Sequence, residues 1–139
     1  MSTTEENKAL VRRFVEEIFV RGNVAAVDEL LADDFVPYTW PYTGDGKKDL
    51  KQAMERVANG LSNPQFVIED EIAEGDRVVV RLKASATQSG EFMKMPPSGK
   101  RYSIEEIHIF RIRDNKVVAH WHQFDQMGLM QQLGALPTK

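Results

Sequence analysis

The chain has 139 residues, 42% hydrophobic and 28% charged, which is enough apolar material for one globular domain spanning residues 1–139. Its 18 basic and 21 acidic residues give a net charge of -3, which argues against nucleic acid as a partner. With no cysteine, disulfides, thiolate metal sites and cysteine nucleophiles are excluded. No apolar run is long enough to span a membrane and no leader pattern is evident, so we expect a cytoplasmic protein without membrane contact.

Apolar residues at helical spacing predict three N-terminal helices, over residues 4–20, 23–32 and 47–60. The first helix repeats Leu10, Phe14 and Ile18 at i, i+4 and i+8, with polar residues on the opposite side. Gly22 follows that helix and is a typical stop signal. The N-terminal part of the chain is therefore expected to pack helices through apolar stripes.

Residues 37–46 interrupt this helical pattern. The segment carries three aromatic residues, Tyr38, Trp40 and Tyr42, among prolines and glycines that prevent regular structure. Aromatic rings in a loop have to rest on a neighbouring surface, so we expect this segment to cover one end of the core.

The period of the apolar pattern changes from Phe66 onward. Alternation of apolar and polar residues predicts four strands, with turns at residues 74–76, 95–99 and 114–115. Consecutive hairpin-type turns make the sheet antiparallel. A last segment, residues 125–133, returns to helical spacing. Helices followed by strands predict an α+β fold with the helices on one face of a curved antiparallel sheet.

All three histidines of the chain, His108, His120 and His122, fall within one predicted hairpin. On the first strand of that hairpin, Glu106 and His108 alternate with outward positions and share a face with apolar residues, so they point inward. Buried polar groups without partners cost about 1 to 3 kcal/mol each. The cluster therefore indicates either a closed hydrogen-bond network or a polar pocket.

The turn decides which residues of the second strand join this cluster. A three-residue loop pairs residue 108 with 120 and 106 with 122, and turns His120 and His122 inward. A two-residue loop pairs residue 108 with 121, and turns Trp121 and Asp125 inward instead. We favour the three-residue loop, because Asn115 suits the left-handed conformation that such a loop requires.

Several segments together form a family pattern: Asn7-Lys8-Ala9-Leu10-Val11-Arg12-Arg13-Phe14, Arg21-Gly22-Asn23, Leu30-Leu31-Ala32-Asp33-Asp34-Phe35, Gly75-Asp76-Arg77-Val78-Val79-Val80-Arg81, Pro96-Pro97-Ser98-Gly99-Lys100, His120-Trp121 and Gln131-Gln132-Leu133-Gly134. In these segments the chain resembles the SnoaL-like polyketide cyclases, or ester cyclases, of the NTF2-like superfamily. The resemblance implies a cone of helices over a curved sheet with a central pocket. It also implies an intramolecular aldol ring closure in aromatic polyketide methyl esters, without a metal or other cofactor.

Carried over to this sequence, the resemblance implies that His108 is the pocket histidine and Glu106 its neighbour. The acid/base position of the family falls on His122, where relatives commonly carry an acidic residue. Asp125 is then the only carboxylate on that strand. The aromatic loop also departs from the pattern, since Pro37-Tyr38 stands where many relatives carry an Asp-His pair.

An imidazole titrates near neutral pH, so His122 is suited to remove a proton alpha to a carbonyl group. His108, oriented by Glu106, is expected to donate a hydrogen bond to the resulting enolate, and His120 is a further catalytic candidate beside them. The substrate predicted by this chemistry is a small apolar or aromatic carbonyl compound. The candidate substrate-binding residues are Tyr38, Trp40, Tyr42, Phe14 and Phe110.

Two other interpretations of the histidine cluster remain open. Two histidines at i, i+2 with a third on the neighbouring strand can form a zinc tripod, with Glu106 as a fourth ligand or as support. Alternatively, the domain binds a small apolar molecule without catalysis.

The outer face of the predicted sheet keeps apolar residues after the inner set is assigned. Val79, Ile107, Ile109 and Trp121 belong to this outer set. An exposed apolar patch usually marks an interface, so we expect a homodimer or a larger homo-oligomer.

Overall fold

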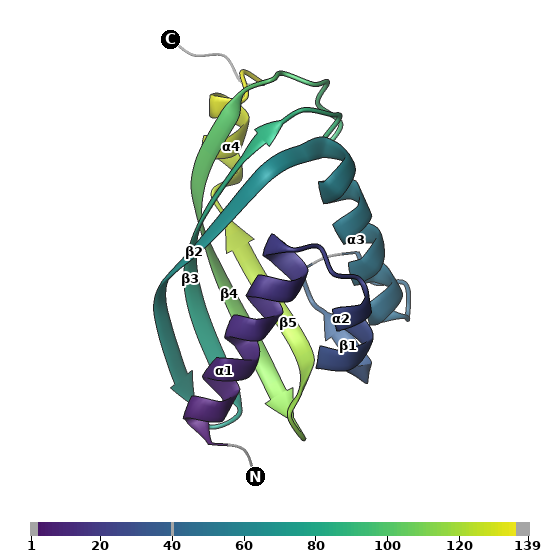
Figure 1. Cartoon of the computed structure of the whole chain (residues 1–139), viewed down its shortest axis with the longest axis vertical. Coiled ribbons are helices and arrows are strands. Elements are labelled where there is room, and N and C mark those ends of the chain that lie inside the picture. The colour runs from purple at the N-terminus through teal and green to yellow at the C-terminus, as the bar shows by residue number, and fades with distance from the viewer. Residues whose placement is uncertain (1–2, 40, 136–139) are drawn as a thin grey trace.

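The computed structural model describes residues 3–39 and 41–135, and places N-terminal helices against a curved sheet (Figure 1). In chain order the elements are α1 (Thr4–Phe14), the π-helix η1 (Val15–Val20), α2 (Ala25–Leu30), β1 (Leu31–Pro37), α3 (Gly46–Gly60), β2 (Leu61–Glu74), β3 (Arg77–Gln88), β4 (Arg101–Arg113), β5 (Lys116–Phe124) and α4 (Gln126–Gln132). The predicted α+β class, with helices first and a curved sheet afterwards, is confirmed.

The sheet has five strands in the order β1-β5-β4-β3-β2. β2, β3, β4 and β5 pair antiparallel through the three predicted turns, as the hairpin signals indicated. The prediction of a wholly antiparallel sheet is wrong at one edge, because β1 pairs with β5 in parallel. The sheet is therefore mixed, and a parallel neighbour places the segment after β1 beside the second half of β5.

The first predicted helix is a regular α-helix only as far as Phe14. Thr3 caps α1 through a reciprocal capping box with Glu6. From Val15 the backbone widens into η1, where the Arg21 N–H donates to the Glu16 carbonyl five residues back. Phe19 belongs to this widened turn, and its ring lies 5.2 Å from the His108 ring. Insertions of this kind are frequent at functional sites.

The other helices differ from the sequence prediction mainly at their ends. α2 ends at Leu30, because Leu31 is already extended and begins β1. α3 covers Gly46–Gly60 as expected, with the Asp45 carboxylate accepting from the Lys48 N–H. α4 begins one residue later than predicted, at Gln126.

Two apolar clusters hold the layers together. The larger one joins α1, η1, α2 and α3 to the inner face of the sheet, and the smaller one lies under α4, where Leu129 and Leu133 meet Tyr102 and Ile104. No helix in the described part of the chain is long and apolar enough to cross a membrane. The inner face between the two clusters is where the histidines lie.

Candidate functional site

A bulge in β5 sets the orientation of the histidines. Asp114 and Asn115 form a two-residue turn, both with positive φ, of 51° and 59°. Ile112 pairs with Val117 but Arg111 pairs with Ala119, so Val118 is an extra residue. The favoured three-residue loop and its pairing of residue 108 with 120 are therefore wrong. The two-residue loop of the alternative is present, but the bulge also displaces its pairing of residue 108 with 121.

Beyond the bulge, Phe110 lies opposite His120, His108 opposite His122, and Glu106 opposite Phe124. Because the extra residue restores the alternation, His120 and His122 still face the same side as Glu106 and His108. The predicted inward direction of these side chains is confirmed, although the partners across the strands are shifted by two residues.

The three imidazole rings lie in a triangle with nearly parallel planes, and we call this group the histidine stack. The centroids of His108 and His120 are 5.1 Å apart, those of His108 and His122 5.2 Å, and those of His120 and His122 5.5 Å, with interplanar angles of at most 11°. The rings of Phe110 and Phe124 flank this group, with centroids 4.8 Å from His120 and 5.7 Å from His122. The histidines are therefore held by ring contacts with each other and with aromatic neighbours.

Glu106, His108 and His120 are joined by short hydrogen bonds. His108 Nε2 donates to Glu106 Oε1 over 2.8 Å, since a carboxylate can only accept. His108 Nδ1 and His120 Nε2 are 2.8 Å apart. Both ring nitrogens of His108 are thus engaged within the protein, and its side chain is buried. His108 cannot donate to a substrate in this arrangement, contrary to the role predicted for it.

His120 is fully buried beneath the helices. Phe14 lies 6.1 Å from its ring and 4.9 Å from Phe110, so the two phenylalanines predicted to bind substrate form the apolar wall behind His120. Burial, together with the neighbouring imidazoles of His108 and His122, holds the pKa of His120 well below its usual value. His120 is therefore a buried, neutral member of the cluster.

His122 is the one histidine of the three that is partly exposed. Its backbone N–H donates to Thr39 Oγ1 over 3.0 Å, and its ring Nδ1 lies 2.9 Å from the same oxygen. Burial, reinforced by His108 and opposed by Glu106, lowers the pKa of His122 from 6.5 to about 4. At neutral pH His122 is thus an uncharged imidazole at the accessible end of the stack. Sequence reasoning missed Thr39, which is 83 residues away along the chain.

The family model for SnoaL-like polyketide cyclases matches residues 9–133, nearly the whole of the chain. The chain belongs to the SnoaL-like polyketide cyclase family. Among curated relatives, nogalonic acid methyl ester cyclase of Streptomyces nogalater is 31% identical over 119 residues, which cover 84% of this chain and 89% of that protein. Aklanonic acid methyl ester cyclase of Streptomyces peucetius is 29% identical over 132 residues, or 90% of this chain and 88% of that protein.

Solved structures carry the same fold as this SnoaL-like chain. TsrD from Streptomyces laurentii superposes with a TM-score of 0.89 at 29% identity, over 98% of this chain and 100% of that one. The predicted resemblance to the SnoaL-like family is therefore confirmed in both sequence and fold.

Asp125, the alternative acid/base residue of this SnoaL-like chain, lies outside the histidine cluster. It is the N-cap of α4, where its carboxylate accepts from the Gly128 N–H over 2.9 Å. A Cβ at Gly128 would stand 2.1 Å from that carboxylate, so a larger residue there would require the Asp125 side chain to shift. The structure does not bring Asp125 to the histidines, because the bulge at Val118 turns odd-numbered positions of β5 outward and Asp125 follows the end of that strand.

The aromatic loop of the SnoaL-like chain does not place its rings as expected. Tyr38 stacks on Trp121 with centroids 4.9 Å apart and an interplanar angle of 6°, and Arg77 lies over the same indole at 5.1 Å. These residues are on the face of the sheet opposite the histidines, so Tyr38 does not cover them. Tyr42 is half-exposed, and Trp40 lies outside the described residues.

The stacked histidines do not form the metal tripod considered from the sequence. Their rings lie parallel instead of converging through their nitrogens, and both nitrogens of His108 are engaged with Glu106 and His120. No group of three ligating side chains in the described ranges is arranged to hold a metal ion.

The terminal Gln-Gln-Leu-Gly segment of the SnoaL-like pattern has a structural role. Gln132 donates its side-chain amide to the Ser103 carbonyl over 3.0 Å and accepts from the Ser103 N–H over 2.8 Å. Because β5 ends opposite Glu106, this stretch of β4 has no strand partner on that side, and the amide of Gln132 replaces it. The motif thus fixes α4 to the sheet.

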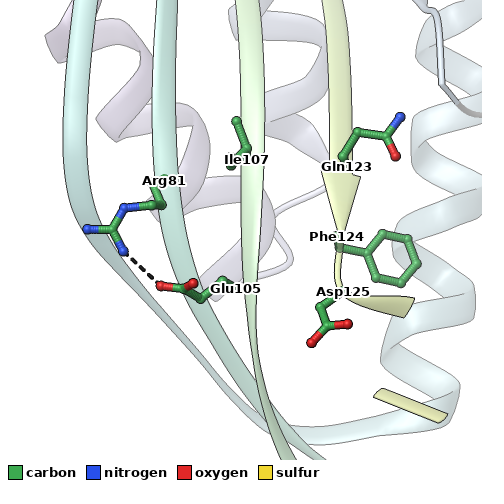
Figure 2. A pocket seen from close by; sticks show the side chains of 6 residues that line it. All are labelled: Arg81, Glu105, Ile107, Gln123, Phe124 and Asp125. Carbon is green, nitrogen blue, oxygen red and sulfur yellow. Dashed lines mark hydrogen bonds and ion pairs between the residues drawn. The ribbon is translucent and has the colours of Figure 1, made fainter. Parts of the chain in front are cut away.

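A shallow depression of about 220 Å³ lies on the outer face of the sheet, as Figure 2 shows. It is lined by Arg81, Glu105, Ile107, Gln123, Phe124 and Asp125. Arg81 is already bound to Glu105 over 2.8 Å and to Asp70 over 2.7 Å. Arg81 is thus already paired, and the depression is shallow and open to solvent. It is therefore a poorer candidate for catalysis than the histidine cluster.

Proposed function

We propose that the chain is a cofactor-independent enzyme that catalyses general acid/base proton transfer on a small apolar carbonyl compound, in an aldol-type ring closure or an isomerisation. The observation that carries this proposal is His122, a neutral and partly exposed imidazole at the end of a buried stack. Membership of a family whose curated relatives are ester cyclases supports the same reaction class.

In the proposed step, His122 removes a proton from the carbon next to a carbonyl group. The electrons of the broken C–H bond form the enolate, whose carbon attacks a second carbonyl of the same molecule and closes the ring. The new alkoxide takes the proton back from the imidazolium. No atom or electron is gained or lost overall, so the reaction requires no oxidant, reductant or cofactor.

The lowered basicity of His122 is compatible with this role. Its pKa of about 4 is close to the 3.9 of an ordinary aspartate, the residue type that the family pattern commonly has at this position. The charge on the base nevertheless differs. A carboxylate base becomes neutral when it takes the proton, whereas neutral His122 becomes a cation. The imidazolium then lies beside the enolate and stabilises it electrostatically.

The buried members of the stack act in this proposal as support. Glu106 fixes His108, and His108 fixes His120, through the two 2.8 Å contacts. His122 stacks on both imidazoles and on Phe124, so its ring plane is restricted. A catalytic group held in one orientation loses less entropy when the transition state forms.

The charges around the stack favour a substrate without a free carboxylate. No lysine or arginine is found among the described buried residues, while Glu106 carries an acidic group into the cluster. A carboxylate on the substrate would meet no counter-charge there and would have to lose its hydration. An ester lacks this cost, and we propose a methyl ester of an aromatic polyketide, the type of substrate named for the relatives.

This function is tested with aklanonic acid methyl ester and nogalonic acid methyl ester as probes. Purified protein in D₂O is expected to accelerate both deuterium incorporation alpha to the carbonyl and loss of the open-chain compound, measured by mass spectrometry and chromatography. The matching free acids serve as controls and are expected to react more slowly. Saturable binding of the esters without exchange or ring closure would instead support the non-catalytic binding function.

We also propose that the outer face of the sheet joins two copies of the chain. Ile72, Val67 and Ile107 are 64%, 57% and 49% exposed there, and the Tyr38–Trp121 stack extends the apolar area. The same face alternates cations with anions, such as Arg81 with Asp70 and Arg111 with Asp76, so a two-fold contact can place opposite charges together.

Light scattering at micromolar concentration is expected to give twice the mass of one chain, and Ile107→Asp to shift it toward one chain. Asn59→Asp, a change on the exposed end of α3, is the control and is expected to leave the mass unchanged. A monomeric mass for the unaltered protein would contradict this proposal.

A further inference from the structure

Thr39 contacts His122 twice, and it does so from the loop that follows β1. Parallel pairing continues beyond β1, because the Tyr38 N–H donates to the His120 carbonyl over 2.9 Å. The next residue, Thr39, therefore lies beside His122 on the neighbouring strand. Its single oxygen, Oγ1, is within 3.0 Å of the backbone nitrogen of His122 and within 2.9 Å of the ring Nδ1.

The loop that carries Thr39 is fixed from both faces of the sheet. On the outer face Tyr38 stacks flat on Trp121, the residue directly before His122 in β5. On the inner side the Thr39 hydroxyl meets His122 itself. Tyr38 and Thr39 thus contact the consecutive residues Trp121 and His122 of β5. These contacts fix the position of the Thr39 hydroxyl relative to the His122 ring.

The chemistry of the hydroxyl allows two arrangements. A threonine hydroxyl has two acceptor lone pairs and one proton. The His122 backbone N–H occupies one lone pair. Nδ1 then either donates its own proton to the second lone pair, leaving Nε2 unprotonated, or accepts the hydroxyl proton, leaving Nε2 protonated. The first arrangement makes Nε2 a base, and the second makes it a hydrogen-bond donor.

We propose that Thr39 is a positioning residue that accepts the Nδ1 proton of His122 and so makes Nε2 the unprotonated ring nitrogen. This inference rests on the proposed function of His122 as the general base. Because Thr39 is exposed, its own hydroxyl proton can be given to water. The oxygen then receives both N–H groups of one residue and holds the ring and the backbone together.

The tautomer can be measured directly, because the chain contains three histidines. Long-range ¹H–¹⁵N spectra of histidine-labelled protein at pH 7 distinguish a protonated from an unprotonated ring nitrogen, and His122→Asn identifies the signals of His122. The expected result is a protonated Nδ1 and an unprotonated Nε2. A protonated Nε2 in the unaltered protein would overturn the inference, whether or not the protein is an enzyme.

Variants at residue 39 then test whether the hydroxyl sets the tautomer. Thr39→Val keeps the shape but removes the hydroxyl, and is expected to shift the tautomer ratio about fivefold toward protonated Nε2, the effect of one typical hydrogen bond. Thr39→Ser keeps the hydroxyl and is expected to restore the original ratio. Thr87→Val on the distant end of β3 is the control, expected to change neither. An unchanged ratio in Thr39→Val would overturn the inference.

Ring closure of aklanonic acid methyl ester provides the second readout. Thr39→Val is expected to lower kcat in proportion to the lost tautomer while KM and the melting temperature stay nearly unchanged, and Thr39→Ser is expected to recover kcat. Failure of the proposed function would appear as no turnover in any variant, including the unaltered protein, while the spectra still report the tautomer. A lower melting temperature of Thr39→Val with an unchanged tautomer ratio would show that Thr39 has only a structural role.

Discussion

Replacing His122 by alanine is expected to lower turnover of aklanonic acid methyl ester by about 10² to 10⁴, the usual contribution of a positioned general acid/base. The reason is that His122 is the accessible imidazole of the stack, while His108 and His120 are buried and engaged with one another. His122→Phe is a useful second variant, since its ring preserves the stacking on Phe124 but carries no nitrogen. Both variants are assayed by initial rates of ring closure at pH 7.

The matched control for this prediction is Gln123→Ala. Gln123 is the next residue of β5, and it is exposed on the outer face of the sheet. Its removal is expected to leave the rate within a factor of two of the unaltered protein. If His122→Ala and His122→Phe both keep full activity while folded, the proton transfer has been assigned to the wrong group, whatever the substrate.

His122→Asp extends the same series to the residue type common in the family. Some activity is expected to remain, because a carboxylate can also accept the proton. Burial lowers the pKa of an imidazole but raises that of a carboxylate. The pKa of His122 is already about 4, so the acid limb of the rate profile is expected to move to higher pH in the aspartate variant. A comparison of rates from pH 4 to pH 8 measures that direction.

The direction of the inward side chains could be predicted from the sequence because it depends on local alternation. Glu106, His108 and Phe110 share one face of β4 as their spacing indicates. The pairing across the hairpin could not be predicted, because the extra residue Val118 lies in an ordinary Val-Val-Ala run without a glycine to mark it. One inserted residue reverses the face of every residue after it, and this is why Asp125 is outside the site.

The contacts of the aromatic loop could not be predicted from the sequence for a different reason. Leu31 continues the apolar pattern of α2, so no local sequence signal indicates that β1 begins at this residue. The parallel pairing of β1 with β5 joins Pro37 to His120, more than eighty residues later, and no turn links the two strands. Without that pairing, neither the stack of Tyr38 on Trp121 nor the contact of Thr39 with His122 can be inferred.

The buried histidines also predict how stability depends on pH. As the pH falls below 6.5, the histidines of the unfolded chain take up protons, while the folded state resists protonation because burial lowers the pKa of His120 and His122. The unfolded state then binds more protons than the folded state, so the free energy of unfolding decreases as the pH falls. Above pH 6.5 both states are neutral at these residues and this loss disappears.

Burial lowers the pKa of His122 from 6.5 to about 4. At 1.36 kcal/mol for each pKa unit, His122 alone is expected to lower the free energy of unfolding by on the order of 3 kcal/mol as the pH falls through this range. Urea unfolding measured at pH 7, 6, 5 and 4 is expected to show this decline, and His122→Phe to show a shallower one. Carboxylates with lowered pKa, such as Asp34 beside Arg113 and Asp76 beside Arg111, lose their contribution only as the pH falls below about 5, so the decline from pH 7 to pH 5 reports on the histidines. A free energy of unfolding that stays constant from pH 7 to pH 5 would mean that the folded stack accepts protons as readily as the unfolded chain, and the assignment of His122 as a neutral base would fail with it.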